Sequence, residues 1–169
     1  MVTWAEFAKA EPEMAALGLR QLQKFGLAYL GTTRKDGSPR VNPVCPVIAD
    51  GRVFVATSPD SPKRLDLLRD GRYVLHMLPG KEEEEFLVRG RARRVEDAET
   101  RAMAVEAARQ DMVPGGPGLH VKPDEWLFEY DIAEAGTTVW LDFGTPDHRP
   151  LRRLWRATPP SSVIPRGAG

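Results

Sequence analysis

The sequence has little of the chemistry that most readily defines a function. Its one cysteine, Cys45, excludes an intrachain disulfide. The three histidines, His76, His120 and His148, are scattered without the spacing of metal ligands, so no metal site is expected. Lys and Arg together number 24, as do Asp and Glu, so no global field attracts the chain to nucleic acid or an anionic membrane. Any charged ligand must therefore be recognised locally.

Long apolar runs are also missing. The first residues, M-V-T-W-A-E-F-A-K-A-E-P, lack a signal-peptide pattern, and no stretch is apolar enough to span a bilayer. We therefore expect a cytoplasmic protein that crosses no membrane. The 169 residues suffice for one hydrophobic core. We expect a single domain over residues 1–158 and a disordered tail over residues 159–169, which are rich in Pro, Ser and Gly.

Extended segments joined by turn signals dominate the first third of the chain. Asp36-Gly37 and Asp50-Gly51 are dipeptides typical of tight hairpins. They separate three apolar runs that we predict to form an antiparallel meander, at residues 27–33, 39–50 and 52–58. Prolines 39, 43 and 46 favour an irregular edge position for the second strand, because proline cannot donate to a sheet.

Three further strands are predicted by alternation of apolar residues. The run 72–78 fits a strand buried on both faces, 84–96 a half-exposed strand, and 126–132 a strand with Trp126, Phe128, Tyr130 and Ile132 on one face. Helices are predicted over residues 11–24, 61–70 and 97–111. We therefore predict a mainly β fold, a small antiparallel barrel with peripheral helices. No glycine-rich pattern of a Rossmann or P-loop nucleotide site follows any strand.

The segment T-S-P-D-S-P-K-R-L-D-L-L-R-D-G-R, residues 57–72, is the most informative. Ser61 is a favoured helix N-cap, Pro62 suits the first helical position, and Gly71 is a natural end. Lys63 and Arg64 then fall in the first turn, where the partial positive charge of the helix makes each cation cost about 0.3–1 kcal/mol.

A bound anion would reverse the cost of these cations. A phosphate held by free backbone N–H groups would be joined by the two cations and by the hydroxyls of Thr57, Ser58 and Ser61. The alternative is that Asp60 and Asp66 neutralise Lys63 and Arg64 on a solvated turn. The sequence alone leaves both hypotheses open.

Three pieces of sequence carry a family resemblance between Trp4 and Tyr130: A-Y-L-G-T-T-R-K-D-G-S-P-R-V-N-P-V, G-R-V-F-V-A-T-S-P-D-S-P-K-R-L-D-L-L-R-D-G-R and V-R-G-R-A-R-R-V-E-D. In this order they resemble the pyridoxamine 5'-phosphate oxidase-like FMN-binding split-barrel family. The resemblance implies a six-stranded antiparallel split β-barrel and a homodimer with FMN between its subunits. The cofactor-binding residues that it implies are Arg40, Val41, Asn42, Pro43, Val44, Thr57, Ser58, Ser61, Lys63 and Arg64.

In such proteins the flavin performs the chemistry, so no catalytic side chain is predicted. The resemblance implies an oxidoreductase that passes hydride or electrons between a nicotinamide cofactor and an unknown small molecule. One alternative is a deazaflavin coenzyme, whose longer acidic tail would need further cations such as Arg34, Lys35 and Arg69. Another is a non-enzymatic module that binds flavin or haem. A barrel that binds nucleic acid is disfavoured, because the aromatic residues alternate like those of a core strand.

The C-terminal part departs from the true oxidase. The arginine and tryptophan arrangement that holds pyridoxamine phosphate has no match, so pyridoxamine oxidation is not expected. We predict the tract R-R-L-W-R, residues 152–156, as a surface helix. His76 is expected in the core or an interface, and Cys45 as a small buried side chain. Trp140 is expected to pack locally, and His120 to lie in a solvent-exposed loop.

Overall fold

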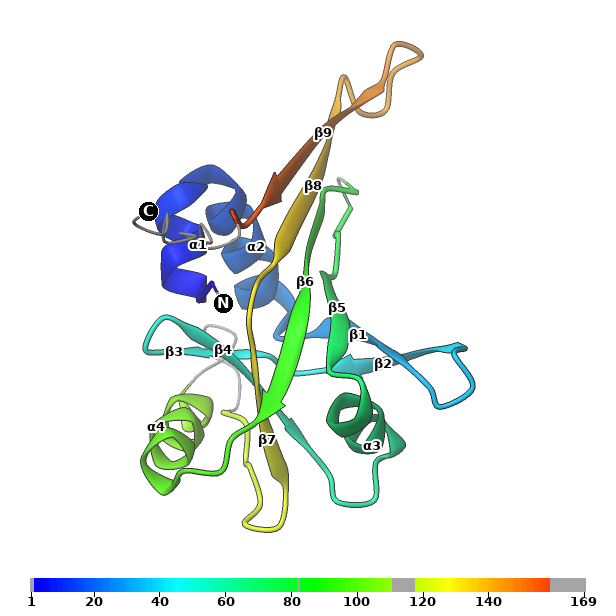
Figure 1. Ribbon diagram of the computed structural model, residues 1–169. Coiled ribbons are helices and arrows are strands. Elements are labelled where there is room, and N and C mark those ends of the chain that lie inside the picture. The colour runs from blue at the N-terminus through cyan, green and yellow to red at the C-terminus, as the bar shows by residue number, and fades with distance from the viewer. Residues whose placement is uncertain (1, 82, 111–117, 159–169) are drawn as a thin grey trace, which may run out of the picture.

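A computed structural model describes residues 2–81, 83–110 and 118–158 (Figure 1). The predicted disordered tail, residues 159–169, lies outside the described residues. Within the described ranges the chain forms nine strands and four helices, and every strand pairing is antiparallel. The strands are β1 Ala28–Thr33, β2 Pro39–Val44, β3 Val47–Ala49, β4 Arg52–Thr57, β5 Arg72–Met77, β6 Glu85–Arg94, β7 Trp126–Tyr130, β8 Glu134–Leu141 and β9 Arg149–Arg156.

The strands form one curled sheet in the order β2-β1-β5-β6-β7-β4-β3, and β8 pairs with β6 and β9. The long strand β6 makes the curl possible, because its first part pairs with β5 and β8 and its last part with β7. This arrangement confirms the predicted mainly β, antiparallel split-barrel fold. The number of strands was wrong, since nine are present rather than six.

Both Asp-Gly hairpins are confirmed. Asp50 and Gly51 have φ of 47° and 66°, the pair of left-handed conformations that a tight hairpin turn requires. The predicted strand 39–50 is divided into β2 and β3, however. The break falls at Cys45 and Pro46, where proline cannot donate to a ladder, and it lets β2 pair with β1 while β3 pairs with β4.

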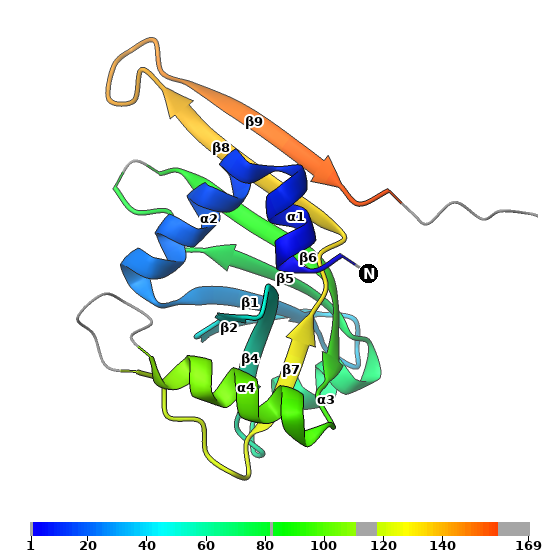
Figure 2. The ribbon, with the colours of Figure 1, turned by 90° about the vertical axis from the view of Figure 1, so that its left-hand side faces the viewer.

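The helices are α1 Trp4–Ala10, α2 Pro12–Phe25, α3 Pro62–Arg69 and α4 Ala98–Arg109. The helix α2 covers β5, β6 and β8, and α4 packs on β3 (Figure 2). The main core gathers the rings of Phe7, Phe86 and Phe128 with the inward side chains of β5. The other face of β5, which was also predicted to be buried, is only half-buried. The helix α1 was not predicted, although its capping box of Thr3 and Glu6 is a visible signal.

The strands β8 and β9 form a hairpin whose far end projects beyond the rest of the sheet (Figures 1 and 2). The predicted helix at 152–156 is wrong, because these residues alternate across β9. Arg153 turns toward the helices, where it donates to Glu11 at 2.9 Å and Glu13 at 2.7 Å. Trp155 likewise turns inward, and its ring centroid lies 5.1 Å from that of Phe7. These two anchors favour the strand.

Candidate functional site

The loop after β4 leads into α3 as the sequence predicted. Ser61 is the N-cap residue, with extended backbone angles of φ −75° and ψ 122°, and Pro62 opens the helix. The Ser61 side chain makes no capping hydrogen bond, so its hydroxyl is not committed to the helix. Leu65 and Leu68, which repeat at helical spacing, are exposed, while Leu67 enters the core.

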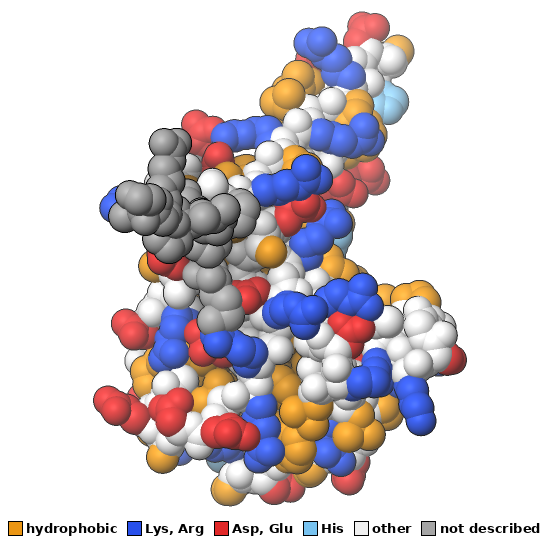
Figure 3. Space-filling model, in the orientation of Figure 1, with side chains coloured by type: hydrophobic (Ala, Val, Ile, Leu, Met, Phe, Trp, Pro, Cys, Tyr) orange, Lys and Arg blue, Asp and Glu red, His pale blue; other side chains and the backbone are white. Residues whose placement is uncertain are grey.

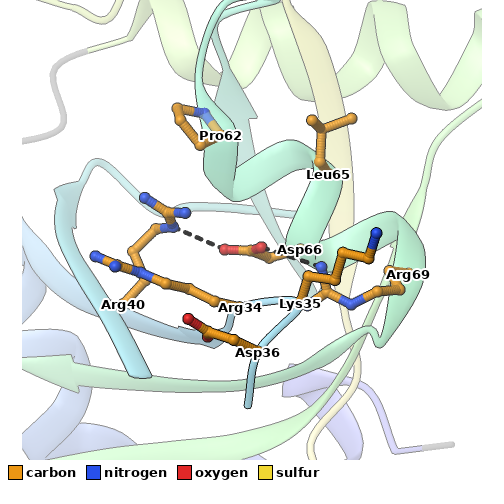
Figure 4. A pocket seen from close by; sticks show the side chains of 8 residues that line it. All are labelled: Arg34, Lys35, Asp36, Arg40, Pro62, Leu65, Asp66 and Arg69. Carbon is orange, nitrogen blue, oxygen red and sulfur yellow. Dashed lines mark hydrogen bonds and ion pairs between the residues drawn. The ribbon is translucent and has the colours of Figure 1, made fainter. Parts of the chain in front are cut away.

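One face of α3 borders a pocket of about 630 Å³ (Figure 4). The helix contributes side chains at the helical spacing of i, i+3, i+4 and i+7, and the turn between β1 and β2 lies opposite. The lining residues are Arg34, Lys35, Asp36, Arg40, Pro62, Leu65, Asp66 and Arg69. Arg40 on β2 is therefore brought against the first turns of α3, near the helix N-terminus.

Asp66 holds this arrangement together. Its side chain is 5% exposed and accepts from Arg40 Nε at 2.7 Å, Thr32 Oγ1 at 3.2 Å and Arg69 at 3.3 Å. Burial pushes the pKa of Asp66 upward, but the hydrogen bonds from Arg40, Thr32 and Arg69 outweigh it and leave the pKa below its ordinary value. Asp66 therefore pairs with both Arg40 and Arg69, and the three side chains together keep one positive charge.

The first-turn cation Lys63 is half-buried and lies outside that pocket. Burial lowers the pKa of Lys63, and the negative charge of Glu125 opposes the shift. Among the described residues Lys63 forms no ion pair, so the alternative in which Asp60 and Asp66 neutralise it does not hold. A positive charge remains in the first turn of α3, at the positive end of the helix dipole, which is a favourable environment for an anion.

Arg64 has a different environment. Its guanidinium carbon lies 4.7 Å from the Trp126 ring centroid, and that of Arg94 lies 4.0 Å from the same centroid. Trp126 pairs with Thr57 across β4 and β7. The Arg64 Nε and the Thr57 hydroxyl are both buried without a hydrogen-bond partner among the described residues. Ser58, in the following loop, is exposed.

The predicted β2 residues divide between two faces. Arg40 lines the pocket and Asn42 is half-buried, while Val44 lies in the main core. Val41 and Pro43 are exposed on the opposite, outward face of the sheet. The ten predicted residues therefore do not form one surface. Arg40 and α3 form the centre of the candidate site. Val41 and Pro43 border this site on the outward face of the sheet.

The sequence did not predict how far the outward face extends. One row of residues crosses six strands in register, and we call it the apolar row: Pro43, Tyr29, His76, Leu87, Gly136 and Leu154. Tyr29 is 48% exposed and Leu154 is 55% exposed. The alternation of residues along β1 indicates which of its side chains point outward. The sequence does not show how β1 aligns with strands far along the chain. Lys and Arg side chains, with some Asp and Glu, lie along the projecting β8–β9 hairpin (Figure 3).

Three further features of the described part of the chain bear on its function. No three His, Cys, Asp or Glu side chains there are grouped to hold a metal ion. No described helix has the length and apolar character needed to cross a membrane. Cys45 is half-buried, and burial raises the pKa of its thiol, which disfavours the nucleophilic thiolate.

The curled antiparallel sheet, with a cationic helix N-terminus at the end of β4, defines a split β-barrel with a candidate anion site. The pyridoxamine 5'-phosphate oxidase family model matches residues 16–138, and the chain belongs to this family. The match confirms the resemblance drawn from the three sequence pieces. No curated protein gives a significant match to the sequence.

Solved structures support the fold at low sequence identity. A pyridoxamine 5'-phosphate oxidase-related, FMN-binding protein from Nostoc punctiforme has a TM-score of 0.56 and 11% identity, with 90% of this chain and 97% of that chain covered. PhzG from Burkholderia lata, in complex with tetrahydrophenazine-1-carboxylic acid, has a TM-score of 0.56, 16% identity and coverage of 92% and 93%. A haem-binding protein from Mycobacterium smegmatis has a TM-score of 0.54, 16% identity and coverage of 80% and 57%.

Proposed function

We propose that this protein binds FMN and holds its phosphate at the N-terminus of α3. The observation that carries the proposal is Lys63, a half-buried cation without an ion pair among the described residues, in the first turn of a helix. The uncommitted hydroxyls of Thr57 and Ser61 lie at the same junction and supply hydrogen bonds that an anion accepts. These residues fit a phosphate better than a neutral group.

Each residue of the site has a distinct task in this proposal. The Lys63 side chain, at the N-terminal end of α3, binds the phosphate, while Asp66 fixes the direction of Arg40 toward the same helix. Val41 and Pro43 offer an apolar border for a flat ring on the outward side. When bound, FMN would supply hydride or electron transfer between a nicotinamide cofactor and a small acceptor.

We further propose that the working form is a homodimer. The apolar row exposes Tyr29 and Pro43 on β1 and β2, and Val41 beside them is 62% exposed. A soluble protein gains by covering such a surface, and a second copy offers the same surface. Sedimentation of the purified protein with FMN is expected to give twice the mass of one chain. A monomer at micromolar concentration would contradict this part of the proposal.

The cofactor proposal is tested by binding. The absorption spectrum of the purified protein is recorded, and the apo-protein is titrated with FMN and riboflavin while ring fluorescence is measured. We expect FMN to bind at least about a hundredfold more tightly than riboflavin, because only FMN carries the phosphate and each charge-assisted hydrogen bond contributes roughly tenfold.

Variants of the chain separate the phosphate site from general charge effects. Lys63→Ala is expected to weaken FMN binding while leaving riboflavin binding unchanged. Lys9→Ala, an exposed cation in the last turn of α1, is the control and should change neither. Equal affinity for FMN and riboflavin in the wild-type protein, or equal losses for both ligands in Lys63→Ala, would refute the phosphate site.

One observation favours a deazaflavin coenzyme as the second candidate. The three cations that its longer acidic tail would need, Arg34, Lys35 and Arg69, lie together in the pocket with Arg40. Arg69 is engaged with Asp66, whereas Arg34 and Lys35 have no ion pair among the described residues. A deazaflavin that binds more tightly than FMN, and loses that advantage in Arg34→Ala, would favour this candidate. Addition of haem to the same apo-protein tests the non-enzymatic alternative by its absorption band.

A further inference from the structure

The pocket between α3 and the turn that joins β1 to β2 holds cations that the proposed phosphate site does not use (Figure 4). We call it the α3 pocket, and its charged lining residues are Arg34, Lys35, Asp36, Arg40, Asp66 and Arg69. Its volume of about 630 Å³ lies within the range of small-molecule sites. In Figure 4 the Arg34 side chain extends toward Arg40, and the Lys35 side chain extends toward Arg69.

The α3 pocket lies on a different side of the sheet from the apolar row. Side chains alternate along a strand, so Arg40 lies on the α3 side of β2, whereas Val41 and Pro43 lie on the outward side. A second copy that covers the apolar row therefore leaves the α3 pocket open. Among the described strands β2 lies at the edge of the sheet. A ligand in the pocket can thus extend around this edge toward Val41.

The charges of the α3 pocket are unbalanced, because four cations line it and only two carboxylates. Arg40 and Arg69 share the carboxylate of Asp66. Arg34 and Lys35 are exposed and form no ion pair among the described residues. FMN with its phosphate on Lys63 leaves these two cations without an anion. A second dianionic group on a ligand would match the excess of two positive charges.

The two carboxylates of the pocket are held by neighbouring groups. Asp36 is bound within its own turn, where it accepts from the Ser38 N–H at 3.0 Å and from the Ser38 hydroxyl at 2.7 Å. Asp66 is buried and accepts from Arg40, Arg69 and a threonine hydroxyl. A carboxylate typically accepts from the ribose 2′-hydroxyl of NADH, whereas a cation binds the 2′-phosphate of NADPH. Unpaired cations beside engaged carboxylates therefore favour NADPH.

The α3 pocket also offers an apolar wall beside its cations. Pro62 and Leu65 line it, and Leu65 is 53% exposed although its side chain is apolar. The flat faces of an adenine base suit such a wall, and the planar guanidinium of Arg34 stacks well on an aromatic ring. A phosphate attached to an aromatic base therefore fits this lining better than a compact inorganic anion.

We propose that the α3 pocket binds the adenosine end of NADPH, with the 2′-phosphate on Arg34 and Lys35 and the base against Pro62 and Leu65. This inference rests on the proposed function, because it names which nicotinamide cofactor the protein takes. Arg40 and Pro43 are separated by about 10 Å along β2, at roughly 3.4 Å per residue, a distance that an extended dinucleotide spans.

The test titrates NADP⁺ and NAD⁺ by calorimetry into the purified protein, once saturated with FMN and once as apo-protein. The oxidised dinucleotides are used because they bind without reducing the flavin. We expect NADP⁺ to bind about a hundredfold more tightly than NAD⁺, since two charge-assisted hydrogen bonds contribute roughly tenfold each. Equal affinity of the wild-type protein for both dinucleotides would overturn the proposal.

Variants locate the 2′-phosphate. Arg34→Gln and Lys35→Gln should each weaken NADP⁺ binding by about tenfold and leave NAD⁺ binding unchanged. Arg20→Gln, which alters an exposed cation of α2, is the matched control and should bind like the wild type. Equal losses for both dinucleotides in Arg34→Gln would overturn the proposal. A loss of NAD⁺ binding in Asp36→Asn would also overturn it, because the pocket would then recognise a ribose hydroxyl.

The failure of this proposal is distinct from the failure of the proposed function. FMN binding that depends on Lys63, together with equal affinities for NADP⁺ and NAD⁺, would leave the flavin site and refute the NADPH site. A preference for NADP⁺ in an apo-protein that binds no FMN would do the reverse. The acidic tail of a deazaflavin has similar chemistry, so a deazaflavin that displaces NADP⁺ would assign the α3 pocket to that tail and overturn the proposal.

Discussion

Replacing Asp66 by Asn tests whether one buried carboxylate holds the candidate site together. The substitution keeps the side-chain shape but removes the negative charge from a position that is 5% exposed. Arg40 and Arg69 then lose their ionic partner, and the amide nitrogen of Asn has no acceptor on either guanidinium. We expect the folded state to lose stability, and Arg40 to lose its fixed direction toward α3.

The magnitude follows from the exposure of the partners. Breaking a fully buried ion pair costs about 3–5 kcal/mol, because a charge is left without water or partner. The Arg40 and Arg69 side chains are 23% and 37% exposed, so water regains part of each guanidinium. We therefore expect a loss of about 2–3 kcal/mol, which for a chain of this size lowers Tm by roughly 4–12 °C.

The same substitution has a defined pH dependence. The folded-state pKa of Asp66 is lowered, despite the opposing effect of burial, by its hydrogen bonds from Arg40, Thr32 and Arg69. A lowered pKa means that the carboxylate stabilises the fold fully above its unfolded pKa of about 3.9, and that this stability is lost as pH falls through the folded pKa. The difference between wild type and Asp66→Asn should be constant from pH 7 to about 4 and shrink below.

Urea unfolding followed by tryptophan fluorescence at pH 7 and at pH 3 measures both effects. Asp70→Asn is the control, because Asp70 accepts at 2.6 and 2.7 Å from Arg72, whose side chain is 65% exposed. This surface pair lowers the pKa of Asp70 to about 2, yet its removal should change stability little. A loss below about 0.5 kcal/mol in Asp66→Asn, or one that is equal at both pH values, would refute the reasoning.

Two further pairs of variants test the packing by urea unfolding. Gly90→Ala should cost about 3 kcal/mol or more, because its Cβ would overlap the Asp131 carbonyl oxygen, whereas Gly136→Ala should stay within about 0.5 kcal/mol. Similar stabilities of Gly90→Ala and Gly136→Ala would contradict the close approach of the Asp131 carbonyl to Gly90. Tyr73→Phe should cost about 1 kcal/mol by losing a 2.6 Å hydrogen bond to the same carbonyl, and Tyr130→Phe should be neutral or stabilising, since its buried hydroxyl has no partner among the described residues. A larger loss of stability in Tyr130→Phe than in Tyr73→Phe would refute this prediction.

The elements that sequence predicted best are those set by local chemistry. Asp50-Gly51 needs no distant partner to favour a hairpin, and Ser61-Pro62 needs none to begin a helix. The β8–β9 hairpin was missed because its stability comes from distant contacts, such as those of Trp155 with Phe7 and of Arg153 with Glu11 and Glu13. Without these, an arginine-rich tract resembles a surface helix.

The candidate site shows the same contrast between features set by local sequence and features set by distant contacts. The boundaries of α3 followed from the sequence, whereas the environment of each side chain depended on the rotation of the helix against strands far along the chain. Arg64 lies over the ring of Trp126, which Arg94 also contacts, and both of these residues come from segments well beyond α3. Asp66 proved to be the partner of Arg40, a pairing that no local spacing indicates.

These environments change the original argument about helix polarity. Two first-turn cations suggested an anion, but the stacking of Arg64 on Trp126 already gives that cation a favourable contact. Lys63 has no such ring contact and no ion pair among the described residues, and the negative charge of Glu125 only partly offsets the burial that disfavours its own charge. Of the two first-turn cations, only Lys63 therefore supports a bound phosphate. A bound dianion at the helix N-terminus would supply a close opposite charge and favour the protonated amine.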